Sequence, residues 1–145
     1  MQQQRTDSFT QADAVPSGTC LIIEDSEFDS QKLTRILNKT LDRMDVAVAT
    51  TLQSAREALA GSQTALILLD NNLPDGLGAN FVQELADDDR LSHIPVIMVS
   101  DWPSPFMWQK AASAGVFYVV NKSEFDGRYI EATLKMAQER SARVN

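Results

Sequence analysis

Short apolar runs alternate with amphipathic stretches along most of the chain. Continuous apolar runs of strand length are typical of strands that are buried on both faces of a parallel sheet. These runs predict five strands, at about residues 19–24, 46–49, 65–69, 95–99 and 116–120.

The stretches between the runs carry apolar residues at helical spacing, which indicates one buried helix face in each. The first has Leu33, Ile36, Leu37 and Leu41 at such positions, and Thr51 is a plausible cap for the second. The expected helices are one between the first two strands, one that ends before Gly115, and others at about 52–60, 79–88 and 124–140.

Five strands that alternate with five helices predict an α/β fold with helices on both faces of the sheet. Right-handed crossovers leave few topologies, and the expected one is a flavodoxin-like (βα)5 doubly wound parallel sheet with strand order 2-1-3-4-5. Residues 1–17 are polar and aperiodic, so they are expected to form a flexible tail. The domain is then expected over 18–142, with 143–145 as the C-terminal end.

Composition narrows the class of protein. The length of 145 residues predicts one domain, and 43% hydrophobic residues are enough for a core. The formal charge of -7 argues against a nucleic-acid partner. The single cysteine, Cys20, excludes an internal disulfide, and the sequence shows neither an apolar run long enough for a membrane span nor a secretion signal. The expected location is cytoplasmic.

Polar side chains follow four of the predicted strands. Glu24 and Asp25 follow the first, Asp70 the third, Ser100 the fourth and Lys122 the fifth. The carboxyl ends of parallel strands meet at one edge of the sheet, where open α/β sheets place their binding sites. We therefore expect these groups to share one site.

This set of groups fits a magnesium ion and phosphoryl chemistry. Glu24, Asp25 and Asp70 supply the hard oxygen ligands that Mg²⁺ prefers, and the main-chain oxygen of Asn72 is a further candidate. An aspartate such as Asp70 can act as a nucleophile toward phosphorus. The Lys122 ammonium and the Ser100 hydroxyl would then stabilise the phosphoryl oxygens.

In these motifs the chain resembles the receiver domains of two-component response regulators, over about residues 18–142. The resemblance implies that Asp70 accepts a phosphoryl group from a histidine kinase or phosphotransfer protein. It assigns Glu24, Asp25, Asp70 and the main-chain oxygen of Asn72 to Mg²⁺, Ser100 to the switch hydroxyl and Lys122 to phosphate binding. Such a protein is not an enzyme beyond its own phosphoryl transfer and dephosphorylation.

Three positions depart from that family pattern. Asp101 replaces a small residue, and it either faces the site and repels a phosphate or faces outward and caps the next helix. Val119 stands where the family has a rotating Tyr or Phe, and Tyr118 points to the opposite face of the strand. Ser123 replaces a proline that follows a cis peptide, so a trans bond is expected.

The segment 102–108 is rich in aromatic residues, and Ser104 with Pro105 predicts a helix start there. Its aromatic side chains either pack on the core or form a surface for a partner. His93 is read as an ordinary loop residue.

The expected function is that of a stand-alone response regulator. It would pass its signal by contact with a downstream protein, through the face formed by the fourth helix, fifth strand and fifth helix. One alternative is a pseudo-receiver that binds proteins and is never phosphorylated. Another is an aspartate-nucleophile phosphatase of the haloacid dehalogenase type, which Asn71 and Asn72 oppose because the second aspartate is missing.

Overall fold

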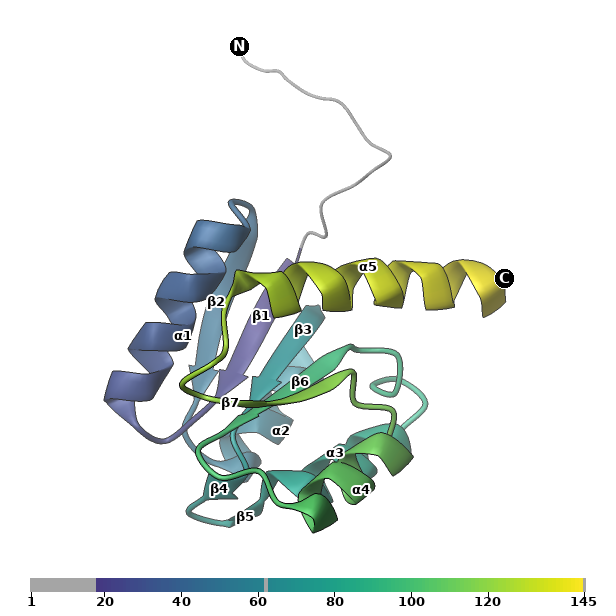
Figure 1. Cartoon of the computed structure of the whole chain (residues 1–145). Coiled ribbons are helices and arrows are strands. Elements are labelled where there is room, and N and C mark those ends of the chain that lie inside the picture. Colours follow the sequence, from purple (N-terminus) through teal and green to yellow (C-terminus); the bar gives the residue numbers. More distant parts are fainter. Residues whose placement is uncertain (1–17, 62, 145) are drawn as a thin grey trace.

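The computed structural model describes residues 18–61 and 63–144, which form a five-stranded parallel sheet between two layers of helices (Figure 1). The sheet has the order β2-β1-β3-β6-β7, and every neighbouring pair is parallel. This is the doubly wound order expected from the sequence, which is thereby confirmed. The strands are β1 (Gly18–Ile23), β2 (Met44–Ala49), β3 (Thr64–Leu69), β6 (Val96–Ser100) and β7 (Tyr118–Asn121).

The helices cover both faces of the sheet because side chains alternate along each strand. In β1, Leu21 and Ile23 pack toward α2, α3 and α4, whereas Cys20 and Ile22 pack toward α1 and α5. In Figure 1, α5 lies in front of the sheet and α2 behind it. The helices are α1 (Glu27–Thr40), α2 (Leu52–Gly61), α3 (Gly78–Ala86), α4 (Pro105–Ser113) and α5 (Gly127–Val144).

Two helix starts follow the capping rules that the sequence suggests. The Thr51 hydroxyl accepts a hydrogen bond from Ser54 N at 2.9 Å, and the Ser54 hydroxyl accepts one from Thr51 N, so the two residues cap α2 reciprocally. The Ser104 hydroxyl accepts a hydrogen bond from Met107 N, with Pro105 in the first helical position of α4. Both predicted caps are confirmed.

A small antiparallel hairpin, β4 (Asn72–Leu73) with β5 (Gly76–Leu77), follows the third strand of the sheet and was not expected from the sequence. The Asp75 carboxylate in its turn accepts hydrogen bonds from Leu52 N at 2.8 Å and Gln53 N at 3.0 Å. The hairpin therefore caps α2 from a distant part of the chain.

Some element boundaries differ from the predicted ones. β7 begins at Tyr118 rather than 116, and α5 begins at Gly127 rather than 124. The Asp126 carboxylate accepts a hydrogen bond from Arg128 N at 3.0 Å, as an N-cap does, so α5 starts only after it. The expected tail at 1–17 lies outside the described residues. None of the described helices is both long and apolar enough to span a membrane.

Candidate functional site

Three carboxylates meet where β1 and β3 end. Glu24 and Asp25 follow β1, Asp70 follows β3, and one carboxylate oxygen from each lies within 4.8 Å of the others. The sheet positions them, because β1 and β3 are neighbours and Asp70 N donates a hydrogen bond to Ile23 O at 2.9 Å. The topology thus converts a separation of 45 residues in sequence into a shared acidic cluster.

Glu24 and Asp70 are buried, whereas Asp25 is exposed. Burial raises the pKa of both buried carboxyls above their ordinary values, because it disfavours the charged form. The nearby Lys122 ammonium opposes this rise in pKa without cancelling it. Two partly desolvated acids beside a third make a site that is stabilised by added positive charge.

Lys122, just after β7, reaches into the cluster. Its Nζ lies 2.7 Å from Glu24 Oε1, 2.8 Å from Asp29 Oδ2 and 3.5 Å from Asp70 Oδ1. Burial lowers the pKa of Lys122, but hydrogen bonds to Asp29 and Glu24 and the charge of Asp70 outweigh burial and raise the pKa well above its usual value. The lysine is therefore a fixed cation in the site.

Asp29 is a member of this site that the sequence reasoning missed. It lies in the first turn of α1, where an acidic residue is usually explained by the helix dipole and by solvent. The same helix supplies Lys32, whose Nζ donates a hydrogen bond to Lys122 O at 3.1 Å. The signal available in the sequence was the spacing of Asp29 from Asp25, which places it one turn into the helix that starts at the site.

Ser100 ends β6 beside the cluster and is fully buried. Its hydroxyl has no hydrogen-bond partner among the described residues. Ser100 O accepts a hydrogen bond from Lys122 N at 3.0 Å, so the two residues lie at the same level of neighbouring strands. A buried hydroxyl that lacks a partner is energetically unfavourable unless another group accepts a hydrogen bond from it.

The loop after Asp70 is held by its own backbone and by one glycine. Gly78 N donates to Asn71 O at 2.7 Å, and Ala79 N donates to Asn71 Oδ1 at 2.9 Å. A Cβ on Gly78 would overlap the main-chain oxygen of Asp70, so only glycine allows α3 to start this close. Asn72 lies in β4, two residues beyond Asp70.

The three departures from the usual pattern have distinct outcomes. Asp101 does not cap α4, because Ser104 does. Its side chain is exposed, with Oδ2 at 4.0 Å from Lys122 Nζ, so it lies at the rim of the site. Val119 is buried on the α4 face and Tyr118 packs edge-on against Tyr129 on the α5 face. All peptide bonds of the described residues are trans, including the one before Ser123.

The aromatic segment that leads into α4 is mostly at the surface. Trp102 is 86% exposed, Phe106 65% and Trp108 50%, and only Met107 of these residues packs in the core. A hollow of about 430 Å³ runs along β7, the edge strand of the sheet, between α4 and α5. Its lining includes Pro103, Trp108, Tyr118, Glu124 and Tyr129. Core packing therefore does not explain these aromatic residues.

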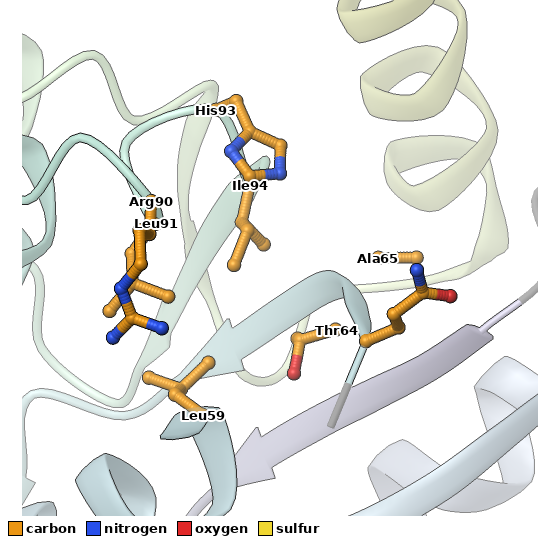
Figure 2. A pocket seen from close by; sticks show the side chains of 8 residues that line it. Leu59, Thr64, Ala65, Arg90, Leu91, His93 and Ile94 are labelled. Carbon is orange, nitrogen blue, oxygen red and sulfur yellow. The ribbon is translucent and has the colours of Figure 1, made fainter. Parts of the chain in front are cut away.

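A second hollow of about 350 Å³ lies where β3 begins, at the sheet edge opposite to the acidic cluster. Figure 2 shows Arg90 and Leu91 across this hollow from Thr64 and Ala65. His93 lines it from the turn before β6, so the interpretation of His93 as a loop residue holds. None of its lining residues belongs to the acidic cluster.

A family model for the response regulator receiver domain matches residues 20–134. This match covers most of the chain. The chain belongs to the receiver domain family. Receiver domains as a family are phosphoacceptor signalling modules rather than true enzymes.

Individual relatives agree with this family. The receiver is 36% identical over 112 residues to the response regulator protein PilR of Pseudomonas aeruginosa, a match that covers 76% of this chain and 24% of PilR. It is 34% identical over 76 residues to the chemotaxis protein CheY1 of Helicobacter pylori, covering 50% of this chain and 61% of CheY1. The chain thus spans less than two thirds of either relative.

The fold also matches solved receivers. The CheY-like receiver domain protein of Methanospirillum hungatei JF-1 superposes with a TM-score of 0.74 over 86% of this chain and 99% of that one. The two sequences are 19% identical, so this likeness concerns the fold alone.

Proposed function

We propose that this receiver works as a single-domain response regulator that accepts a phosphoryl group on Asp70 from a histidine kinase or phosphotransfer protein. The observation that carries the proposal is the meeting of Asp70 with a fixed ammonium, Lys122, and a buried unpartnered hydroxyl, Ser100. Those are the groups that an incoming phosphoryl group needs around the attacking carboxylate.

The transfer step uses Asp70 as the nucleophile. One Asp70 carboxylate oxygen forms a bond to phosphorus while the nitrogen–phosphorus bond of the donor's phosphohistidine breaks. The bonding electron pair leaves with the imidazole nitrogen, and the product is an acyl phosphate on Asp70. Lys122 and Ser100 donate hydrogen bonds to the phosphoryl oxygens. Hydrolysis later adds water to phosphorus, releases inorganic phosphate and restores the carboxylate.

The donor set of the site fits a magnesium ion. Glu24, Asp25 and Asp70 offer three carboxylates with oxygens within 4.8 Å of one another, and Mg²⁺ prefers such hard ligands. Asp25 and Asp70 would bind the ion directly, Glu24 would hold a metal-bound water, and Asn72 O would add a main-chain ligand. When bound, the ion supplies positive charge that relieves repulsion between the carboxylates and the phosphoryl oxygens.

Output would pass through contact with a downstream protein on the face formed by α4, β7 and α5. This face carries the hollow along β7 and the exposed side chains of Trp102, Phe106 and Trp108. Aromatic residues are enriched in the cores of protein interfaces, and exposed patches of this kind usually mark contact sites.

A small phosphodonor tests the proposal. Incubation with acetyl phosphate and Mg²⁺ should add one phosphoryl group, seen by intact mass and removed by hydroxylamine, and Asp70→Asn should remain unmodified. Asp45→Asn, which removes an exposed carboxylate on β2, is the matched control and should be modified like the wild type.

Val119 and Asp101 favour a second candidate, a pseudo-receiver that binds proteins without being phosphorylated. A pseudo-receiver would show no gain in mass when the wild type is incubated with acetyl phosphate and Mg²⁺. Labelling of Asp70→Asn as strong as that of the wild type would contradict the assignment of Asp70.

A further inference from the structure

Helix α1 makes hydrogen bonds to both the side chain and the main chain of Lys122. Its Nζ donates a hydrogen bond to Asp29 Oδ2 at 2.8 Å, and its main-chain oxygen accepts one from Lys32 Nζ at 3.1 Å. Asp29 and Lys32 lie three residues apart, so they occupy the same face of the helix. By contrast, Nζ lies 3.5 Å from Asp70 Oδ1. The ammonium is thus bonded more closely to α1 than to the expected phosphoacceptor.

We infer that Asp29 is a positioning residue that holds Lys122 toward α1 until a phosphoryl group on Asp70 competes for the ammonium. The inference rests on the proposed function and adds a residue outside the acidic cluster and the Ser100–Lys122 pair. Lysine has three N–H donors, and in the resting protein two carboxylates, Glu24 and Asp29, lie within hydrogen-bond distance of Nζ.

A phosphoryl group on Asp70 changes the balance between these acceptors. It brings about -1.5 to -2 charges and three strong acceptor oxygens. To reach them, Nζ gives up or lengthens its bond to Asp29, whose side chain is only 24% exposed and whose charge also repels the phosphoryl group. Part of the stabilisation that Lys122 gives to the phosphorylated form is therefore offset by loss of the Asp29 bond.

Through this competition, Asp29 lowers the affinity of the receiver for a phosphoryl group on Asp70. Apparent affinity falls when the binding-competent arrangement is only one of two populated states. Removal of the Asp29 charge should free Lys122 and raise the affinity for a phosphoryl group. In the described part of the chain, the loss of the Asp29–Lys122 hydrogen bond leaves only the bond from Lys32 Nζ to Lys122 O between α1 and the start of the β7–α5 connection. Phosphorylation is therefore expected to weaken the attachment of α1 to this connection.

The test uses beryllofluoride with Mg²⁺ as a phosphoryl mimic on the full chain. Asp29→Asn should bind beryllofluoride about threefold to tenfold more tightly than the wild type, the range for a partly buried charge-assisted bond. Glu27→Gln is the matched control, because it removes an exposed acid from the same helical turn without contact to Lys122. It should bind like the wild type, and Asp29→Glu should restore most of the wild-type affinity.

The ε-methylene resonance of Lys122 gives a second readout, which is measured on the free variant and compared with the free and beryllofluoride-bound wild type. In the absence of beryllofluoride, Asp29→Asn should shift this resonance part of the way toward its beryllofluoride-bound position, whereas Glu27→Gln should not. A merely structural role of Asp29 would lower thermal stability without this shift.

The outcomes separate the two proposals. Equal or weaker beryllofluoride binding by Asp29→Asn, with normal binding by the wild type, would overturn the inference and leave the proposed function intact. Failure of both the wild type and Asp29→Asn to bind beryllofluoride would overturn both.

Discussion

At the scale of single residues, Asp70 is held in an environment that disfavours its own charge. Its pKa is raised, chiefly by burial, although Lys122 and the Asn71 N–H favour the ionised form. A carboxyl with a folded-state pKa above its unfolded value favours folding while it is protonated. That contribution is fully present below the unfolded pKa and is lost as the pH rises through the folded pKa.

Asp70→Asn should therefore be more stable than the wild type at neutral pH, without Mg²⁺. The gain in melting temperature should shrink at acidic pH, because the wild-type carboxyl with its raised pKa is protonated as the pH falls. Thermal melts in a chelator at both pH values measure this difference, with Asp45→Asn as the exposed control. A gain that is equal at both pH values would show that ionisation of Asp70 is not its cause.

The sequence revealed the residues of the acidic cluster but not their contacts. Glu24, Asp25 and Asp70 follow apolar runs, and the rule that parallel strands end at one edge brings them together. Asp29 carries no such mark, because an acid in a first helical turn has an ordinary explanation. Its role depends on which way Lys122 turns, and strand pattern alone does not determine a long side chain's direction.

At the scale of elements, the start of α3 is packed against the backbone of Asp70. Gly78→Ala would place a methyl group on the main-chain oxygen of Asp70, where no flexible side chain can move away. Overpacking of this kind costs about 1–3 kcal/mol of unfolding free energy. It should also weaken Mg²⁺ binding, since the displaced atom belongs to Asp70.

Gly61→Ala at the end of α2 is the matched control for that substitution. No atom lies within 4 Å of its added Cβ, so it should leave stability unchanged or raise it by up to about 1 kcal/mol. Urea unfolding of both variants measures the difference. Equal stability of the two variants would mean that the β3–α3 loop adjusts without cost.

The segment between β6 and α4 is the element expected to respond to phosphorylation. Val119 has no polar tip and a stiff first torsion, so it cannot rotate as an aromatic residue would. A displacement of Ser100 should instead pass to Asp101 and to the start of α4. The main-chain oxygen of Asp101 accepts a hydrogen bond from Asn121 Nδ2 at 2.9 Å.

Amide hydrogen exchange with and without beryllofluoride should therefore change most over residues 100–110, and little at Tyr118 and Val119. A phosphoryl group shifts an equilibrium only by its differential stabilisation of two states. Protection changes confined to β7, with 100–110 unaffected, would show that the signal takes another route.

Elements with a long pattern could be predicted from the sequence, and short ones could not. The five strands and five helices show clear apolar runs or helical periodicity. The strands β4 and β5 have two residues each, too few for any period, so the hairpin was missed. The late start of β7 was missed because Val116 and Phe117 continue the apolar run in the sequence. In the structure these two residues precede the strand, and the Phe117 ring instead packs against the Arg140 guanidinium, 4.2 Å from the ring centroid.

At the scale of the whole molecule, net charge and topology act together on cation binding. The chain carries a formal charge of -7, and the sheet brings three of its carboxylates together. A ligand that binds only the folded state stabilises it by mass action. Mg²⁺ at a hundred times its dissociation constant should add about 2.7 kcal/mol to the unfolding free energy.

Removal of Mg²⁺ with a chelator should reverse that gain in the wild type, and Asp25→Asn should show a much smaller one. Calorimetric titration checks the affinity, and Trp102, two residues beyond Ser100, offers a fluorescence signal. Equal Mg²⁺ affinity of the wild type and Asp25→Asn would exclude Asp25 as a ligand.

Because Cys20 is buried and is the protein's only thiol, its reactivity reports how frequently the interior opens. Cys20 lies in β1, between β2 and β3, and burial raises the pKa of its thiol far above the usual value. A thiol reagent can therefore react only after α1 or α5, which pack on this face of the sheet, has moved away from β1. The rate of alkylation then reports how frequently the native protein opens, and ligands that bind the strand ends should slow it.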